Sequence, residues 1–164
     1  LIQTTTDTAF SITAKISPNF PAETRNGAGA CIYNTTNGRM IRWGPHAAGT
    51  KSSSTNSYWR SVHKTASVTA DITESFISQQ GAVTGFYKLV KTPEKVIQEW
   101  WSSDGIAWTL QWSESASTYI ENSGTVDRVG VAIFSSNTSG TTPLTSFWWF
   151  RYNWTADFHG TLDN

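Results

Sequence analysis

Residues 84–112, TGFYKLVKTPEKVIQEWWSSDGIAWTLQW, decide the fold class of this chain. Three apolar runs alternate with two turn sequences in this stretch, the runs at 84–91, 95–101 and 106–112 and the turns at 92–94 and 102–105. Short runs rich in Val, Ile, Tyr and Trp, bounded by Pro, Gly, Asp and Ser, are typical of strands joined by tight turns. The stretch therefore predicts a three-stranded antiparallel β-meander.

The same pattern of short strands and polar turns continues through the rest of the chain. Further strand-like runs lie at 10–16, 28–34, 39–43, 58–62, 129–134 and 145–152. Asn37-Gly38 predicts a hairpin turn between two of these runs, because both residues tolerate positive φ. Residues 44–57 have the composition of a long loop, and 63–82 hold either one strand around 68–72 or a crossing between sheets. About eight to ten short strands with hardly any helix pattern predict an all-β fold, an antiparallel two-sheet β-sandwich or jelly roll.

Length and composition limit the function classes. The 164 residues suit a single domain, 1–164, and a start without an initiating Met leads us to expect that the chain is part of a longer protein. Twelve basic residues balance twelve acidic ones and no basic run occurs, so a nucleic-acid partner is not expected. No apolar stretch approaches the ~20 residues of a membrane helix, so we expect no membrane insertion.

Signals for a cofactor or for catalysis are weak. Cys31 is the single cysteine, which rules out an internal disulfide and predicts a small buried residue. The three histidines lack metal-binding spacing and no Asp-x-Asp cluster supports calcium, so we expect neither a metal nor another cofactor. Glycoside hydrolysis needs two carboxylates across a cleft, whereas Glu94, Glu114 and Glu121 fall in turn-like segments that suit solvated charges. We therefore expect a protein that is not an enzyme, with a glycoside hydrolase as the remaining alternative.

The nine tryptophans are more than a core of this size needs, and four of them form two adjacent pairs, Trp100-Trp101 and Trp148-Trp149. Neighbouring side chains of a strand point to opposite faces, so both members of a pair cannot enter the same core. One indole of Trp100 and Trp101 is therefore expected outside the core. For Trp148 and Trp149, burial on both faces is an open alternative because the surrounding run is so apolar.

The third run of the meander has a clear alternation of apolar and polar residues. We expect Ile106, Trp108, Leu110 and Trp112 on its core face and Ala107, Thr109 and Gln111 on its other face. On this interpretation Trp108 is a packing residue of the core.

Two registers fit the strand before it. One puts Trp101 and Glu99 in the core and leaves Trp100 outside, and a shift of one residue does the reverse. The cost of burying an unpaired carboxylate favours the second register, unless Glu99 has a partner such as Arg. In either register, one indole shares a face with Thr109 and Gln111.

Candidate sugar contacts follow from this geometry. An exposed indole offers a flat apolar surface for a pyranose ring, and polar neighbours bond the hydroxyl groups of the sugar. The expected glycan-binding residues are Trp100, Trp101, Glu99, Thr109 and Gln111, with Tyr58, Trp59 and Arg60 beside the long loop as second choices. The alternative is that a loop or a neighbouring subunit covers the second face of the hairpin.

Six segments carry a family resemblance in their order along the chain. They are FSITAKI at 10–16, AGACIY at 28–33, FYKLV at 86–90, VIQEWWSSDGIAWTL at 96–110, VGVAIF at 129–134 and TSFWWFR at 145–151. Together they resemble the concanavalin A-like (laminin G-like) jelly-roll modules, in particular small accessory modules with a Ser-x-Asp-Gly-x-x-Trp-Thr hairpin. The resemblance covers most of the chain and implies a β-sandwich with a general tendency to bind glycans or cell surfaces. It carries over no binding residue, because this superfamily places ligands at different edges and faces.

The expected function is that of a non-catalytic recognition module that binds carbohydrate on glycosylated cell surfaces, from an extracellular position or a virion surface. The polar, disulfide-free chain is also similar to the terminal receptor-binding domains of bacteriophage tail fibres, which implies host-receptor binding and a homotrimer. The alternative is a structural or oligomerisation module of a virion or surface assembly, with its surplus aromatic residues buried between subunits. Tripeptides at 34–36, 137–139 and 153–155 match the N-glycosylation pattern, which matters only in a eukaryotic secretory pathway.

Overall fold

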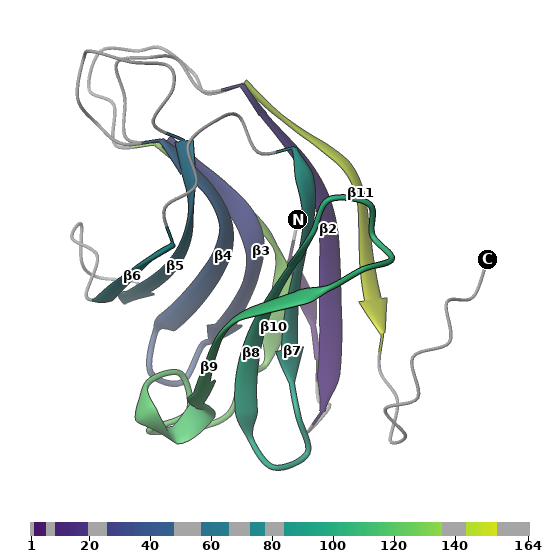
Figure 1. Cartoon of the computed structure of the whole chain (residues 1–164). Coiled ribbons are helices and arrows are strands. Elements are labelled where there is room, and N and C mark those ends of the chain that lie inside the picture. The colour runs from purple at the N-terminus through teal and green to yellow at the C-terminus, as the bar shows by residue number, and fades with distance from the viewer. Residues whose placement is uncertain are drawn as a thin grey trace.

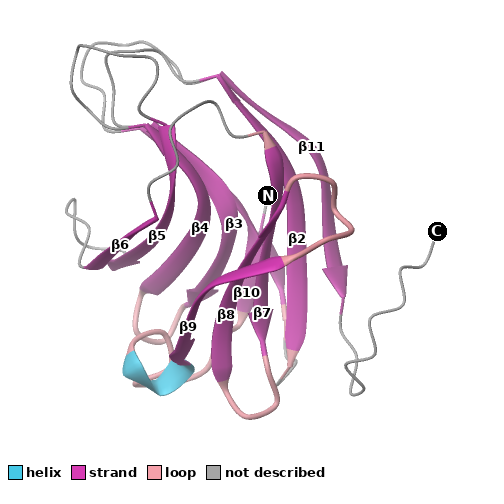
Figure 2. Ribbon diagram, viewed as in Figure 1, coloured by secondary structure: helices cyan, strands magenta, loops and turns pink. Residues whose placement is uncertain are grey.

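Two antiparallel sheets lie face to face in the computed structural model of the chain (Figure 1, Figure 2). The structure describes residues 2–5, 9–19, 26–47, 57–65, 73–77, 84–135 and 144–153, with side chains at 4–5, 9–17, 27–45 and 84–133. The predicted all-β, antiparallel two-sheet β-sandwich is therefore confirmed. Within the described part of the chain, no helix is both long and apolar enough to cross a membrane.

Six strands form the first sheet and five form the second. The first sheet has the order β1 (Ile2–Thr4), β10 (Arg128–Ser135), β3 (Asn26–Asn34), β4 (Arg39–Ala47), β5 (Ser57–Thr65) and β6 (Thr73–Ile77). The second has the order β11 (Leu144–Asn153), β2 (Phe10–Asn19), β7 (Gly85–Lys91), β8 (Val96–Ser102) and β9 (Thr109–Ser115). The predicted meander forms β7, β8 and β9, and β9 lies at the edge of its sheet.

The core fills the space between the inner faces of the two sheets. The second sheet contributes the buried residues Phe10, Ile12, Ala14, Ile16, Tyr87, Leu89 and Ile97. The first sheet contributes Ala28, Ala30, Ile32, Ile41, Trp43, Val129 and Val131. Trp43 joins the sheets directly, because its indole Nε1 donates a hydrogen bond to the main-chain oxygen of Trp100 at 2.8 Å. Its ring also meets that of Tyr87 edge to face, with centroids 5.9 Å apart.

The segment after β9 closes one end of the sandwich beside that strand (Figure 2). It contains the short 3-10 helix η1 (Ala116–Thr118), and Ile120 and Val126 beyond it enter the core. Lys91 of β7 forms an ion pair with Glu121 of this segment, with N and O 2.5 Å apart and side chains only 3% and 4% exposed. A buried charge is tolerated because it is paired with an opposite one.

The turn between β3 and β4 is the predicted Asn-Gly hairpin, and it is bonded to the same closing segment. Asn34 is buried, and its Nδ2 donates to the main-chain oxygens of Ile120 at 2.8 Å and Ser123 at 2.9 Å. Its Oδ1 accepts a hydrogen bond from the N–H of Thr36 at 3.0 Å. In the folded protein the Asn34 amide is therefore not accessible to a glycan, whatever the tripeptide pattern predicts.

Other predicted elements differ from the structure only at their ends. The predicted strand at 58–62 is β5, which is longer, and residues 44–47 of the predicted loop extend β4. The strand predicted around 68–72 lies outside the described residues, and β6 begins just after it. Cys31 is buried as predicted, and burial raises the pKa of its thiol to about 11.

Candidate functional site

The adjacent indoles Trp100 and Trp101 occupy opposite faces of β8. In the pairing of β7 with β8, Trp101 lies opposite Tyr87 and Trp100 lies opposite Lys88. Tyr87 is a core residue, so Trp101 faces inward, where it packs against the core. Trp100 therefore faces away from the first sheet, which confirms the prediction that one of these indoles is outside the core.

Glu99 lies on the inner face, and this corrects both its expected role and the preferred register. It pairs with the core residue Leu89 and has 0% of its surface exposed, so it cannot contact a sugar beside Trp100. The register that the cost of burying a carboxylate favoured is therefore wrong. Glu99 has an interaction partner in the structure. A partner is what makes the burial of a carboxylate tolerable.

The connection between β8 and β9 is longer than the predicted four-residue turn. The strands end and begin at Ser102 and Thr109, so residues 103–108 form the loop. Side chains satisfy its main chain: Asp104 Oδ1 accepts from the N–H groups of Ile106 at 2.8 Å and Ala107 at 2.9 Å, and from the Ser102 hydroxyl at 2.8 Å. The hydrogen bond from Ile106, followed by those from Ala107 and Ser102, lowers the pKa of Asp104.

The longer loop overturns the expected core face of the third strand. Ile106 is 78% exposed, and Leu110 and Trp112 are 42% and 41% exposed. Seven residues separate Trp101 from its partner Thr109, instead of the four expected between Trp101 and Ile106, and this odd shift of three places Leu110 on the outer side, opposite Trp100. Sequence periodicity therefore predicted the strand but placed Leu110 on the wrong face, whereas Trp112 lies on the inner side opposite Glu99 and is exposed because β9 is the edge strand.

A β-bulge in the pairing of β8 with β9 fixes which residues surround Trp100. Trp100 lies opposite Leu110 and Glu99 opposite Trp112, so Gln111 is the unmatched residue of the bulge. Thr109 lies opposite Trp101, on the inner side of the strand. Thr109 is therefore not a neighbour of the outward indole, which corrects the expected grouping.

Trp108 also belongs to the outer face and not to the core. Lys88 is on the outer side of β7, and its Nζ lies 3.7 Å from the centroid of the Trp108 ring. This is a close cation–π contact. Burial lowers the pKa of Lys88. The prediction that Trp108 packs in the core is therefore wrong. The Trp108 ring packs on Lys88 at the outer face of the second sheet.

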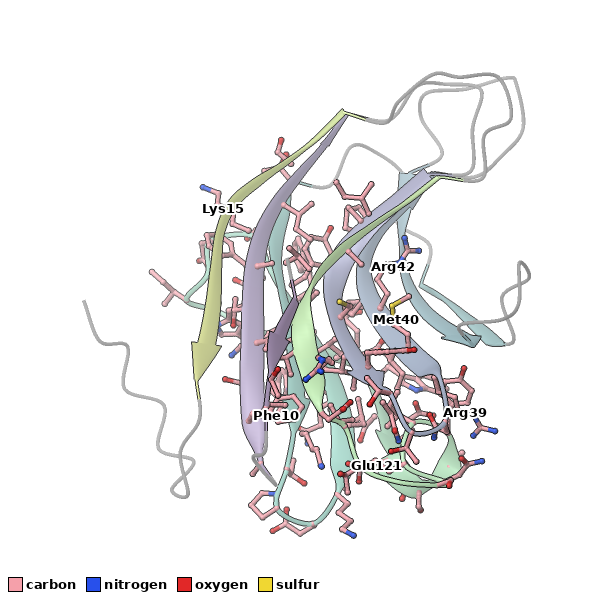
Figure 3. The ribbon with its side chains drawn as sticks, turned by 180° about the vertical axis from the view of Figure 1, so that it is seen from behind. Phe10, Lys15, Arg39, Met40, Arg42 and Glu121 are labelled. Carbon is pink, nitrogen blue, oxygen red and sulfur yellow. The ribbon has the colours of Figure 1, made fainter. Side chains whose placement is uncertain are left out.

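Further contacts hold the neighbouring side chains in place. The Trp100 indole Nε1 donates a hydrogen bond to Gln98 Oε1 at 3.2 Å. Lys15 Nζ lies 5.3 Å from the ring centroid of Phe86, and Figure 3 shows the Lys15 side chain pointing away from the sandwich. Gly105, at φ +81°, lies against the same Phe86 ring, where a Cβ would come within 3.1 Å of it. The loop is therefore packed onto the sheet.

These residues form a half-buried surface on the outer face of the second sheet, which we call the aromatic platform. It consists of Phe86, Trp100, Trp108 and the exposed Leu110, with Gln98, Lys15 and Lys88 around them. The core packs against the inner side of its strands. The hydrogen bond to Gln98 and the contacts with Lys88 and Lys15 hold its rings in place. Flat, partly exposed indoles with polar side chains beside them suit the stacking of a ring with apolar faces and hydroxyl edges.

The second-choice contacts lie elsewhere in the fold. Tyr58, Trp59 and Arg60 are in β5 of the first sheet, where they pair with His46, Pro45 and Gly44, and their side chains lie outside the described residues. They belong to a different sheet from Trp100, so they do not complete the aromatic platform. The side chains of Trp148 and Trp149 in β11, and Trp154, are also outside the described residues.

The described carboxylates are engaged in the structure or lie apart from the platform. Glu99 is in the core, Glu121 pairs with Lys91, and Asp127 accepts hydrogen bonds from Thr35. Among the described residues, no group of three or more His, Cys, Asp or Glu side chains is placed to hold a metal ion. The described outer face can therefore contact a ligand by ring stacking, by hydrogen bonding and through positively charged side chains.

Comparison with solved structures shows where this fold recurs. A functionally unknown protein from Saccharomyces cerevisiae has a TM-score of 0.64 and 14% identity, over 93% of this chain and 71% of that one. A mutant of the GH43 protein BlXynB from Bacillus licheniformis has a TM-score of 0.65 and 20% identity, over 92% of this chain and 28% of that one. This chain thus spans little more than a quarter of the GH43 protein. No protein-family model matches the sequence, and neither does any curated protein. At these identities the similarity shows the fold alone.

Proposed function

We propose that this chain is a non-catalytic recognition module that binds carbohydrate through the aromatic platform. The observation that carries the proposal is the position of Trp100 and Trp108. Both indoles are partly exposed on the outer face of a sheet whose inner face is already filled by the core. An indole that the core does not use, fixed in orientation by Gln98 or Lys88, is a preorganised surface for a sugar ring.

Other findings are consistent with this proposal. The GH43 neighbour belongs to a glycoside hydrolase family, so the same fold occurs in a protein that acts on carbohydrate. The resemblance to concanavalin A-like modules leads in the same direction. A glycosylated cell surface as partner, an extracellular or virion-surface location, and a relation to phage tail fibres form the wider part of the proposal.

The residues of the described outer face support a proposal of binding without hydrolysis. Hydrolysis of a glycosidic bond uses two carboxyl groups on either side of the bond. The described residues of the aromatic platform include no carboxyl group, and Glu99 is separated from the platform by the sheet itself. We therefore propose that the chain is not an enzyme.

A glycan array followed by calorimetric titration tests the proposal. Trp100→Ala and Trp108→Ala each remove a stacking surface, and we expect binding to weaken about 30-fold or more, as for other binding hot spots. Trp112→Ala is the matched control, because Trp112 is an indole that is even more exposed, at 41%, but lies on the other side of β9. Absence of any bound glycan, or equal loss with all three variants, would contradict the proposal.

A second candidate function is assembly with further copies of the chain. The observation that favours it is the edge strand β9, where Leu110 and Trp112 are exposed, next to the exposed Ile106 of the loop. Large apolar side chains at an unpaired strand edge are typical of surfaces that pair with another chain. Light scattering on the protein and on Trp112→Ser distinguishes the two functions. An oligomer that dissociates in the variant would support assembly, and a monomer throughout would exclude it.

A further inference from the structure

The outer face of the second sheet carries an unbalanced charge. The described side chains at its outward positions are Ser11, Thr13, Lys15, Ser17, Phe86, Lys88, Val90, Val96, Gln98, Trp100, Ser102, Leu110, Ser113 and Ser115. Two of these are lysines and none is acidic, although acidic and basic residues are equal in number over the whole chain. The described outward positions of this sheet therefore carry two positive charges and no negative one.

Lys88 is the central charge of this face. It lies opposite Trp100 in the strand pairing and under the ring of Trp108, so it is next to both indoles of the platform. The side chain is half-buried, which costs the ammonium part of its hydration and lowers its pKa. The contact with the Trp108 ring offers the ammonium the face of an aromatic ring and no opposite formal charge.

The acidic residue of the adjoining loop, Asp104, is held by hydrogen bonds within the loop. Asp104 uses Oδ1 for hydrogen bonds with Ser102, Ile106 and Ala107, which hold the loop in its conformation. Among the described residues, no carboxylate forms an ion pair with Lys88. An anionic group brought by a ligand would therefore meet a partly dehydrated cation at the edge of the two indoles.

From this geometry we propose that the ligand of the aromatic platform is an acidic saccharide, whose sugar ring stacks on Trp100 and Trp108 while its carboxylate pairs with the ammonium of Lys88. Lys15 lies at the other end of the platform, with its Nζ over the ring of Phe86. The inference rests on the proposed carbohydrate binding and adds the chemical class of the sugar.

Matched pairs of sugars test this inference separately from carbohydrate binding itself. The probes are oligogalacturonate, a glucuronate-containing disaccharide and sialyllactose, each compared with its own methyl ester, which keeps the ring and removes the charge. We expect at least one acid to bind about tenfold or more tightly than its ester, as for a hydrogen bond to a charged group. Lys88→Gln should reduce this preference to about twofold or less. Lys88→Arg should retain it, and Lys95→Gln, at an exposed lysine of the β7–β8 turn, should leave it unchanged.

The possible outcomes separate the two proposals. Equal binding of acid and ester, with both lost in Trp100→Ala, would overturn the acidic ligand and leave carbohydrate binding intact. An acid preference that survives in Lys88→Gln would overturn the role of Lys88. Binding of sulfated lactose as tight as that of the best carboxylated sugar would overturn the assignment of a carboxylate. Absence of binding to every sugar would contradict both proposals.

Discussion

Replacement of Trp43 by Phe tests how the two sheets hold the platform strand in place. Trp43 extends from β4 of the first sheet, is completely buried, and donates its Nε1 hydrogen to the main-chain oxygen of Trp100 at 2.8 Å. Trp100 follows the point at which the β8–β9 register shifts. The bond therefore joins the core directly to the residue that carries the proposed binding surface.

Two costs of the substitution follow from the structure. Phe has no donor, so a buried carbonyl loses its partner, which costs about 1–3 kcal/mol. The smaller ring leaves a void in a closed core, which adds about 1 kcal/mol, while most of the edge-to-face contact with Tyr87 remains. We expect Trp43→Phe to lower the free energy of unfolding by about 2–4 kcal/mol, or Tm by about 4–16 °C for a chain of this size.

Urea denaturation at neutral pH, followed by circular dichroism, measures this loss. Trp112→Phe is the control, because Trp112 is 41% exposed, and a change within about 0.5 kcal/mol is expected there. Equal destabilisation by the two substitutions, or a loss below about 1 kcal/mol for Trp43→Phe, would refute the claim that this indole couples the sheets.

Three further predictions concern the end of the sandwich and the β8–β9 loop. Glu121→Gln leaves its buried lysine partner without an opposite charge and should lower the free energy of unfolding in urea by about 3–5 kcal/mol. Glu94→Gln, in an exposed turn, should change the free energy of unfolding little. Similar losses for the two variants would contradict the role of the ion pair. Asp104 has a pKa lowered below 3.8, chiefly by the N–H of Ile106, so its stabilising effect should be complete at neutral pH and lost as pH falls through the lowered value. Asp104→Asn should remove this part of the acid dependence of Tm, and an unchanged acid limb would oppose that account. Asn34→Asp places a carboxylate oxygen against the main-chain carbonyls of Ile120 and Ser123 and should lower the free energy of unfolding by about 2 kcal/mol or more. An unchanged Tm in a thermal scan would show that the two hydrogen bonds of Asn34 do not stabilise the fold.

The fold class was predictable because short apolar runs and turn residues are local signals. The alternation in β2 and the Asn-Gly turn before Arg39 each match one structural element. The separation of Trp100 from Trp101 was also predictable, since it depends only on the pleat of a strand and not on its register. These inferences needed no knowledge of the partner strands.

The face of β9 was not predictable from alternation alone. Its register depends on the length of the loop, which Ser102 and Asp104 set through side-chain hydrogen bonds to the main chain, and on a bulge at Gln111. The sequence Ser-x-Asp-Gly predicts a four-residue turn, whereas the loop that forms runs from 103 to 108. The signal that could have found Trp108 on the outer face is the position of Lys88, a cation on the outward side of β7 that an indole can cover.

The burial of Glu99 illustrates a second limit. A carboxylate in a core position is costly when it is alone, and the sequence does not show which side chain of the other sheet meets it. The expected contacts of Glu99 and Thr109 with a sugar on the side of Trp100 therefore could not be tested before the two faces of β8 and β9 were assigned. With both assigned to the inner side, the candidate site reduces to the aromatic platform.

The measurement that tests the central claim most directly is a titration of the ¹⁵N-labelled protein with its best-binding glycan, followed through the indole N–H signals of its nine tryptophans. The account predicts that the signals of Trp100 and Trp108 shift together and saturate, while those of Trp43 and Trp112 stay in place. Saturating shifts at Trp112 or at Trp59 of β5, with Trp100 and Trp108 unmoved, would contradict it and place the binding surface elsewhere on the sandwich.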